Sequence, residues 1–331
     1  MKKYLFISIA ATAMLASCTN DEIVEVAPQG NAIAFSNAFV DKATRATDVT
    51  EVSEIIVNGW RTKGATTQQN FSNQEVKKSG STWTYNPVQY WDANYSYVFE
   101  TAYNVGGVAT WNPANTGGTI TVNNNDGETD VLYARVEKAA EDQTTVAFTY
   151  NHMLSRVKFS FKNAFESTAA AKITVTDVTL KAYTSASVTP VNVAKPYWTF
   201  ATGAALAETG MEFTSSATDM AAGSVEKETE HHYIIPNAQA EGATAKADYL
   251  VSFNVVLTQG SVSDTYTHTN LELPIKLQAG NSYDFTVELK AENVNPAEQL
   301  NPIVFSASVK GWDNVEEPVT VPEAKETEKA E

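Results

Sequence analysis

One nine-residue stretch constrains the fold of this chain more than any other: "SYDFTVELK", residues 282–290. Its apolar residues, Tyr283, Phe285, Val287 and Leu289, alternate with polar ones. Successive side chains of a β-strand point to opposite faces of the sheet, so this period of two predicts a strand with one buried face. The stretch must therefore lie against an apolar core on one side.

The same alternation recurs elsewhere in the chain. It is regular in "RVKFSFKN" (156–163) and in "YLVSFNVVLT" (249–258). In "KITVTDVTLKAY" (172–183) the apolar phase slips by one residue, which predicts a β-bulge near Thr176 and Asp177.

Segments of this kind form two groups of about seven, separated by turns rich in Gly, Asn, Asp and Thr. The first group covers 31–37, 54–60, 82–91, 95–103, 118–123, 130–138 and 145–153. The second covers 156–163, 172–183, 197–200, 231–237, 249–258, 282–290 and 302–312. These groups predict an all-β protein of two antiparallel β-sandwich domains in tandem, residues 31–155 and 156–321.

The N-terminus has the features of an export signal. Lys2 and Lys3 precede an apolar run, residues 4–15, that is long enough for a signal-peptide core and too short to span a bilayer. The sequence "LASC" that ends at Cys18 resembles the bacterial lipobox, in which the peptide is cut before the cysteine and the thiol is acylated. We therefore predict a lipoprotein signal peptide at 1–17 and a lipidated Cys18.

Residues 18–30 are predicted to form an acidic tether, which resembles the surface-export signal of Bacteroidota lipoproteins. Together with the lipid, this tether predicts a lipoprotein of the outer membrane at the cell surface. At the other end, residues 322–331 are charged and lack apolar anchors, so a mobile charged tail is expected there.

Composition excludes two other possibilities. Cys18 is the single cysteine, so no disulfide can hold the fold together and a packed core must do so. The net charge is −16, and it becomes −18 when Lys2 and Lys3 leave with the signal peptide. A surface this acidic repels nucleic acid.

Residues with catalytic or metal-binding potential show no motif. The chain has four histidines, none at a metal-ligand spacing, and each is predicted to be structural: His152, His231, His232 and His268. There is no nucleophile elbow. A glycosidase would need two converging carboxylates, and no spacing in the sequence indicates such a pair. The sequence therefore predicts neither an enzyme nor a bound cofactor.

The stretch "NNNDGETD" (123–130) resembles a calcium-binding loop only superficially. Aligned on Gly127, such a loop would have Val122 at its first ligand position and Tyr133 at its last, and neither supplies a carboxylate. The dipeptide Asp126-Gly127 is instead typical of a hairpin turn.

Nine aromatic residues are concentrated between positions 83 and 111. They are Trp83, Tyr85, Tyr90, Trp91, Tyr95, Tyr97, Phe99, Tyr103 and Trp111. Aromatic side chains favour strands and cores, and they can also form platforms that bind sugars. Core packing and a glycan-binding surface are thus two alternatives.

Six stretches together resemble the fimbrillin family of Bacteroidales, the pilins of type V pili and their lipoprotein relatives. They are "YNPVQYWDANYSYVFETAY", "DVLYARVE", "VAFTYNHMLSRVKFSF", "HHYIIPNAQ", "AGNSYDFTVELK" and "FSASVKGWDNV", in the family's order. The resemblance implies two transthyretin-like β-sandwiches. It also implies that an arginine-specific protease cuts after the first strand, and that a strand from another subunit fills the groove so opened.

The resemblance assigns roles to particular residues. Ile33 and Phe35 would belong to the displaced strand, and cleavage would fall between Arg45 and Ala46. Three residues near the C-terminus would form a candidate donor strand: Val315, Val319 and Val321. Pro318 interrupts that segment and removes a backbone donor, which weighs against it.

From these observations we predict a structural or adhesive subunit of a type V-like pilus, assembled by strand exchange after proteolysis. Its expected partners are other pilin subunits, of its own or another kind, an arginine-specific protease, and a host or bacterial surface glycan or protein. The alternative is a glycan-binding surface lipoprotein that uses the aromatic residues of the first domain.

Overall fold

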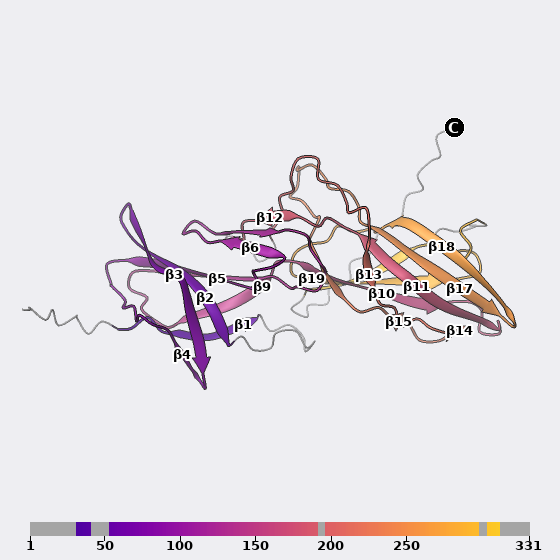
Figure 1. Cartoon of the computed structure of the whole chain (residues 1–331), viewed down its shortest axis with the longest axis horizontal. Coiled ribbons are helices and arrows are strands. Elements are labelled where there is room, and N and C mark those ends of the chain that lie inside the picture. Colours follow the sequence, from indigo (N-terminus) through magenta and orange to yellow (C-terminus); the bar gives the residue numbers. More distant parts are fainter. Residues whose placement is uncertain (1–30, 41–52, 191–195, 298–302, 312–331) are drawn as a thin grey trace, which may run out of the picture.

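The structure, a computed structural model, describes residues 31–40, 53–190, 196–297 and 303–311. Every regular element in these ranges is a β-strand. Strands of the first half of the chain lie at one end of an elongated molecule, and most strands of the second half lie at the other (Figure 1). Within the same ranges, no helix is long and apolar enough to span a bilayer. The predicted all-β class is confirmed.

The first half of the chain forms a seven-stranded sheet that curls back on itself. Its order is β1 (Phe35–Val40), β9 (Val146–His152), β8 (Leu132–Lys138), β5 (Ser96–Tyr103), β2 (Glu54–Lys63), β3 (Thr66–Ser79) and β4 (Thr82–Thr84). The two edge strands, β1 and β4, contact each other, and Ala32 forms a β-bridge with Tyr90. The curled sheet therefore surrounds its own apolar core.

The second half contributes two facing sheets. One contains β15 (Lys227–Glu228), β16 (His232–Ile234), β10 (Ser155–Asn163), β19 (Asn281–Leu289) and β20 (Phe305–Gly311). The other contains β13 (Met211–Phe213), β14 (Met220–Ala221), β11 (Ala171–Lys181), β17 (Leu250–Gln259) and β18 (Val262–Glu272). Their inner faces meet, for example where the rings of Phe161 and Phe253 lie 5.2 Å apart between centroids. This arrangement is a β-sandwich.

A third, small sheet joins the two halves of the chain. It contains β12 (Ala186–Val188), β7 (Thr119–Val122) and β6 (Ala109–Asn112). The larger apolar cluster accordingly includes Ile120 and Val131 from the first half along with the sandwich residues of the second. The division of the chain into domains at residues 155 and 156 stays a prediction.

The predicted strand faces are confirmed. Tyr283, Phe285, Val287 and Leu289 are all buried, as are the apolar positions of β10 and β17. The predicted β-bulge is also present, because the pairing of β11 with β17 shifts register between Thr176 and Thr179. Asp177 adopts a positive φ of 53° in the bulge.

Three predictions of local structure are wrong. The sheets are not wholly antiparallel, because β1 pairs with β9 and β10 pairs with β19 in parallel. In both cases the two paired strands are separated by a long stretch of chain, which allows the second strand to start at the same end of the sheet as the first. Asp126-Gly127 is not a hairpin turn, because β7 and β8 on either side of it belong to different sheets. Residues 197–200 make only one isolated bridge, at Thr199.

Candidate functional site: the first-strand groove

The segment that leads into β1 is held by backbone hydrogen bonds to two distant parts of the chain. The amide of Ile33 donates to Gln89 O at 2.9 Å, and the amide of Trp91 donates to Asn31 O at 2.9 Å. On the other side, the amide of Val146 donates to Ala34 O at 2.8 Å. The strand then pairs in parallel with β9, with Phe35 opposite Val146.

Ile33 and Phe35 point into the apolar core of the curled sheet. Ile33 is 1% exposed and Phe35 is 5% exposed. We call the surface on which they lie the first-strand groove. It consists of Phe71, Tyr85, Gln89, Phe99, Val146 and Phe148.

Four rings surround the phenyl ring of Phe35. Its centroid lies 5.4 Å from Tyr85, 5.7 Å from Phe71, 6.0 Å from Phe99 and 6.1 Å from Phe148. The first three contacts are steeply inclined, edge-to-face in character, and the contact with Phe148 is stacked. Such pairs add to the stabilisation that burial of the ring alone provides.

Tyr85 also fixes the backbone of the strand. Its hydroxyl donates to Ile33 O at 2.7 Å. Burial raises the pKa of Tyr85 above its ordinary value, so the hydroxyl stays protonated and remains a donor. The contact therefore anchors the strand at one defined register.

A glycine in the interior of β2 makes room for the rings of the groove. A Cβ atom at Gly59 would lie 2.9 Å from Cδ2 of Phe71 and 3.0 Å from Cδ1 of Phe99. Sequence reasoning did not identify Gly59, although a glycine inside a predicted strand often marks close packing of another group.

All residues of the groove come from positions 71–148, so none of them belongs to the first strand itself. If the strand left, the rings that line the groove would lose their cover. Burying each large apolar side chain is worth roughly 1.5–3 kcal/mol. An open groove would thus be an adhesive surface for any strand of matching shape.

The chain matches a known family over most of its length. The sequence profile described as "Fimbrillin-like" matches residues 44–312. The chain belongs to the fimbrillin-like family. This is a family of cell-surface fimbrial subunits that assemble with other pilin subunits, and it is not a family of enzymes.

The solved structures that this fimbrillin-like chain matches are distant from it in sequence. A Bacteroides uniformis protein described in terms of cell adhesion is 16% identical, with a TM-score of 0.47, and the match covers 85% of this chain and 98% of that one. The fimbrial anchor protein Mfa2 of Porphyromonas gingivalis is 12% identical, with a TM-score of 0.34 and coverage of 86% and 97%. No curated protein sequence matches the chain.

Several predicted site residues of the fimbrillin-like chain lie outside the described residues. They are Cys18, Arg45, Ala46, Val315, Val319 and Val321. Of the predicted functional residues, the structure places only Ile33 and Phe35, and it brings them together in one groove.

The aromatic residues between positions 83 and 111 mainly build the core. Trp83 and Trp91 are 8% and 6% exposed, and the ring of Trp91 lies 4.8 Å from that of Tyr97. Tyr90, in contrast, is half exposed. Core packing is therefore the correct alternative for most of this set, and the two tryptophans are not available as a platform for sugars.

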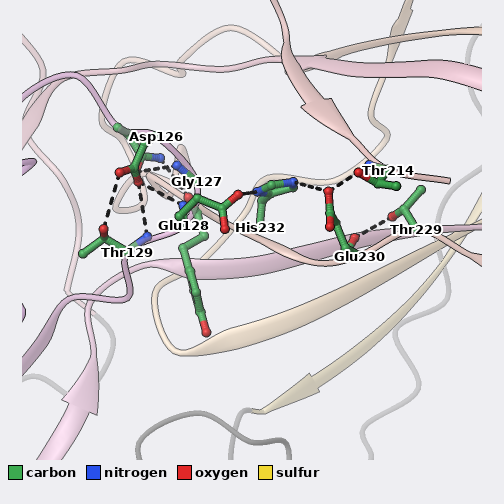
Figure 2. A network of polar contacts seen from close by, with 10 residues as sticks. Asp126, Gly127, Glu128, Thr129, Thr214, Thr229, Glu230 and His232 are labelled. Atoms are coloured by element: carbon green, nitrogen blue, oxygen red, sulfur yellow. Dashed lines mark hydrogen bonds and ion pairs between the residues drawn. The ribbon is translucent and has the colours of Figure 1, made fainter.

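A polar network ties a loop of the first half to a strand of the second half (Figure 2). The amide of Tyr233 donates to Gly127 O at 2.8 Å. Nδ1 of His232 lies 3.0 Å from Oε1 of Glu128, and Nε2 lies 3.5 Å from Oε1 of Glu230. Figure 2 shows the imidazole between these two carboxylates. His232 is thus buried beside two carboxylates that link neighbouring parts of the fold, which agrees with the structural role predicted for it.

Gly127 allows this loop to dock so closely. Its φ is +81°, and a Cβ atom there would lie only 2.9 Å from Nδ1 of His232. Asp126 closes the turn by accepting from the amides of Glu128 and Thr129 at 2.9 and 3.2 Å. The stretch is therefore a turn, as predicted, but one that docks on another sheet.

The most deeply buried carboxylate of the described residues is also structural. Glu100 is fully buried and accepts from Arg135 Nη1 at 2.5 Å, from the hydroxyl of Tyr133 at 2.8 Å and from the amide of Gly118 at 3.1 Å. The bond from Gly118 holds the loop before β7 in place, while those from Tyr133 and Arg135 come from the neighbouring strand β8. Among the described residues, no group of three or more His, Cys, Asp or Glu side chains is placed to bind a metal ion.

Proposed function

We propose that this protein is a non-enzymatic structural or adhesive subunit of a type V-like pilus, assembled by strand exchange. The observation that carries the proposal is the position of the first strand in a protein of the fimbrillin-like family. It lies at the edge of the sheet, and Ile33 and Phe35 fill a groove made wholly by later parts of the chain.

A single cut would separate this strand from the rest of the chain. Arg45 follows β1 by five positions, within the polar stretch "DKATRATD". Cleavage between Arg45 and Ala46 would leave the strand held only by non-covalent contacts. A strand of another subunit could then add to the same sheet edge, with backbone hydrogen bonds supplying affinity and side-chain pockets supplying selectivity.

The two ends of the chain complete the proposal. Acylation of Cys18 would anchor the precursor in the outer membrane, since two or more acyl chains hold firmly where one is marginal. Residues Val315, Val319 and Val321 would form a strand that this chain donates to the groove of another subunit. The protein would thus reside at the cell surface or in a fimbria.

The strand-release step can be tested with an arginine-specific protease. The full chain, without its signal peptide, is treated with the protease, and the product is examined by mass spectrometry, size-exclusion chromatography and electron microscopy. We expect a cut after Arg45, followed by release of the first strand in the presence of other pilin subunits and by assembly. The variant Arg45→Ala should remain uncut at that position and monomeric. A wild-type chain that is cut but keeps its first strand under these conditions would contradict the proposal.

Membrane anchoring has its own test. Cys18→Ser should prevent acylation and shift the protein from the membrane fraction to the soluble fraction, as measured by fractionation and mass spectrometry of the N-terminus. Ser17→Ala, next to the cysteine, serves as the control and should leave the protein in the membrane. Equal membrane retention of Cys18→Ser and the wild type would refute the lipid anchor.

A further inference from the structure

The pocket for Phe35 in the first-strand groove is shaped for an aromatic ring. Four rings surround it, from Phe71, Tyr85, Phe99 and Phe148. Because three of these rings meet the flat phenyl ring of Phe35 edge to face and the fourth is stacked on it, a branched aliphatic side chain would leave part of every contact unmade.

The pocket is also unable to close around a smaller side chain. Phe71 packs against Tyr85 and Phe99 with centroids 5.4 and 5.7 Å apart, so these rings support one another without Phe35. Phe99 lies in β5, which is paired on both sides by β2 and β8. Rings held in paired strands move little, so an under-filled pocket keeps its void.

The C-terminal segment of the chain does not carry the side chain that this pocket needs. Residues 313–331 contain no Phe, Tyr or Trp. In this segment, two of the proposed donor residues, Val319 and Val321, have the same spacing as Ile33 and Phe35. If Val319 took the place of Ile33, Val321 would enter the ring pocket and fill it incompletely.

We infer that the first-strand groove selects a strand with an aliphatic residue followed two positions later by an aromatic one. The groove therefore takes its strand from a different pilin chain and discriminates against the C-terminal segment of its own kind. This inference rests on the proposed function, because the groove must first be vacated. It implies that the chain joins a mixed fimbria and does not polymerise with itself.

The inference can be tested with peptides and the full chain after cleavage at Arg45. A fluorescent peptide of residues 31–40 is exchanged into the groove, and unlabelled peptides compete with it while anisotropy is recorded. The competitors are the native 31–40 peptide, its Phe35→Val variant, its Ala34→Ser variant, the 314–323 peptide, and that peptide with Val321→Phe. Ala34 is exposed, so Ala34→Ser is the matched control.

We expect Phe35→Val to weaken competition by about tenfold or more, since the valine side chain buries several carbons fewer than the phenyl ring. Ala34→Ser should compete like the native peptide. The 314–323 peptide should be a weak competitor, and Val321→Phe should strengthen it by a similar factor. A gain of binding of this kind cannot arise from misfolding of the protein.

Two results would overturn the inference in distinguishable ways. If the labelled peptide binds but the Phe35→Val and 314–323 peptides compete within threefold of the native one, the groove is not selective, while strand exchange itself stands. If the cleaved chain never releases its first strand and no peptide enters, the proposed function fails and the inference fails with it.

Discussion

Ile33 and Phe35, at the start of the first strand, and the apolar residues of β19 are buried at the same two-residue spacing, yet the fold attaches the two strands in different ways. β19 lies between β10 and β20 and forms ladders with both, so its backbone is paired along most of its length on either side. β1 is an edge strand that pairs only with β9, and its ladder is interrupted between Ser36 and Phe39. Figure 1 places the two strands in different parts of the molecule.

The burial of a side chain and the attachment of its strand are therefore separate properties. Phe285 and Phe35 are both almost inaccessible to solvent. Removing β19 would break two ladders in the centre of a sandwich. Removing the first strand would break one short ladder at an edge and the two backbone hydrogen bonds that join residues 31–33 to Gln89 and Trp91. The two strands thus bury their side chains equally well but differ in the number of ladders that hold them, which is why exchange is proposed for the first strand and not for β19.

The largest expected effect on stability is at the central strand, β19. Phe285→Ala should lower the free energy of unfolding by about 3–5 kcal/mol, because a fully buried ring leaves a cavity. Thr286→Ala, on the other face of the same strand, should change it by less than about 0.5 kcal/mol. Denaturant unfolding of both variants measures this, and equal losses would show that the faces are assigned wrongly.

Phe35→Ala tests the edge strand and should lower the free energy of unfolding by less, about 3 kcal/mol or below, because β1 can open before the rest of the chain unfolds. Its effect should also be local, since edge elements open without global unfolding. Hydrogen exchange should accelerate at residues 31–36 and remain unchanged in β19. Equal acceleration of hydrogen exchange in both strands would show that they do not differ in local stability. The control is Ala34→Ser, which should leave the exchange rates unchanged.

Mild acid should weaken the second half of the chain through His268. Burial lowers the pKa of His268, whose Nε2 donates to Val294 O at 3.0 Å. The unfolded chain binds the proton more readily, so this contribution to stability is complete above the ordinary histidine pKa of about 6.5 and is lost as the pH falls through the lowered pKa. The unfolding free energy of the wild type relative to His268→Gln should therefore decrease between about pH 7 and pH 5. A pH-independent difference would contradict this.

Salt should have the smallest effect on the binding of the first strand. Its effect shows whether apolar or electrostatic contacts hold the strand in the groove. The segment 18–45 contains four acidic and two basic residues, so its departure changes the net charge little. Salt screens charges and leaves contacts such as those of Phe35 intact. The affinity of the 31–40 peptide should stay within about threefold between 0.05 and 0.5 M salt, measured by anisotropy. A steep loss with salt would mean that charges hold the strand.

Part of the fold could be predicted from the sequence because alternation marks buried faces directly. The faces of β10, β17 and β19 and the bulge near Asp177 followed from apolar spacing alone. The pattern failed where strands carry polar residues on both faces. β3 and β18 are long but mostly exposed, so little apolar signal marked them.

The sequence by itself determined which side chains face a core, and it suggested the importance of Ile33 and Phe35 through a family resemblance. Only the tertiary structure decided that Phe71, Tyr85, Phe99 and Phe148 converge on Phe35, and that Gly59 leaves them room. Local spacing fixes the direction of a side chain, because that direction depends on the backbone of its own strand. The neighbours of that side chain depend on strand order and register, which join residues more than a hundred positions apart.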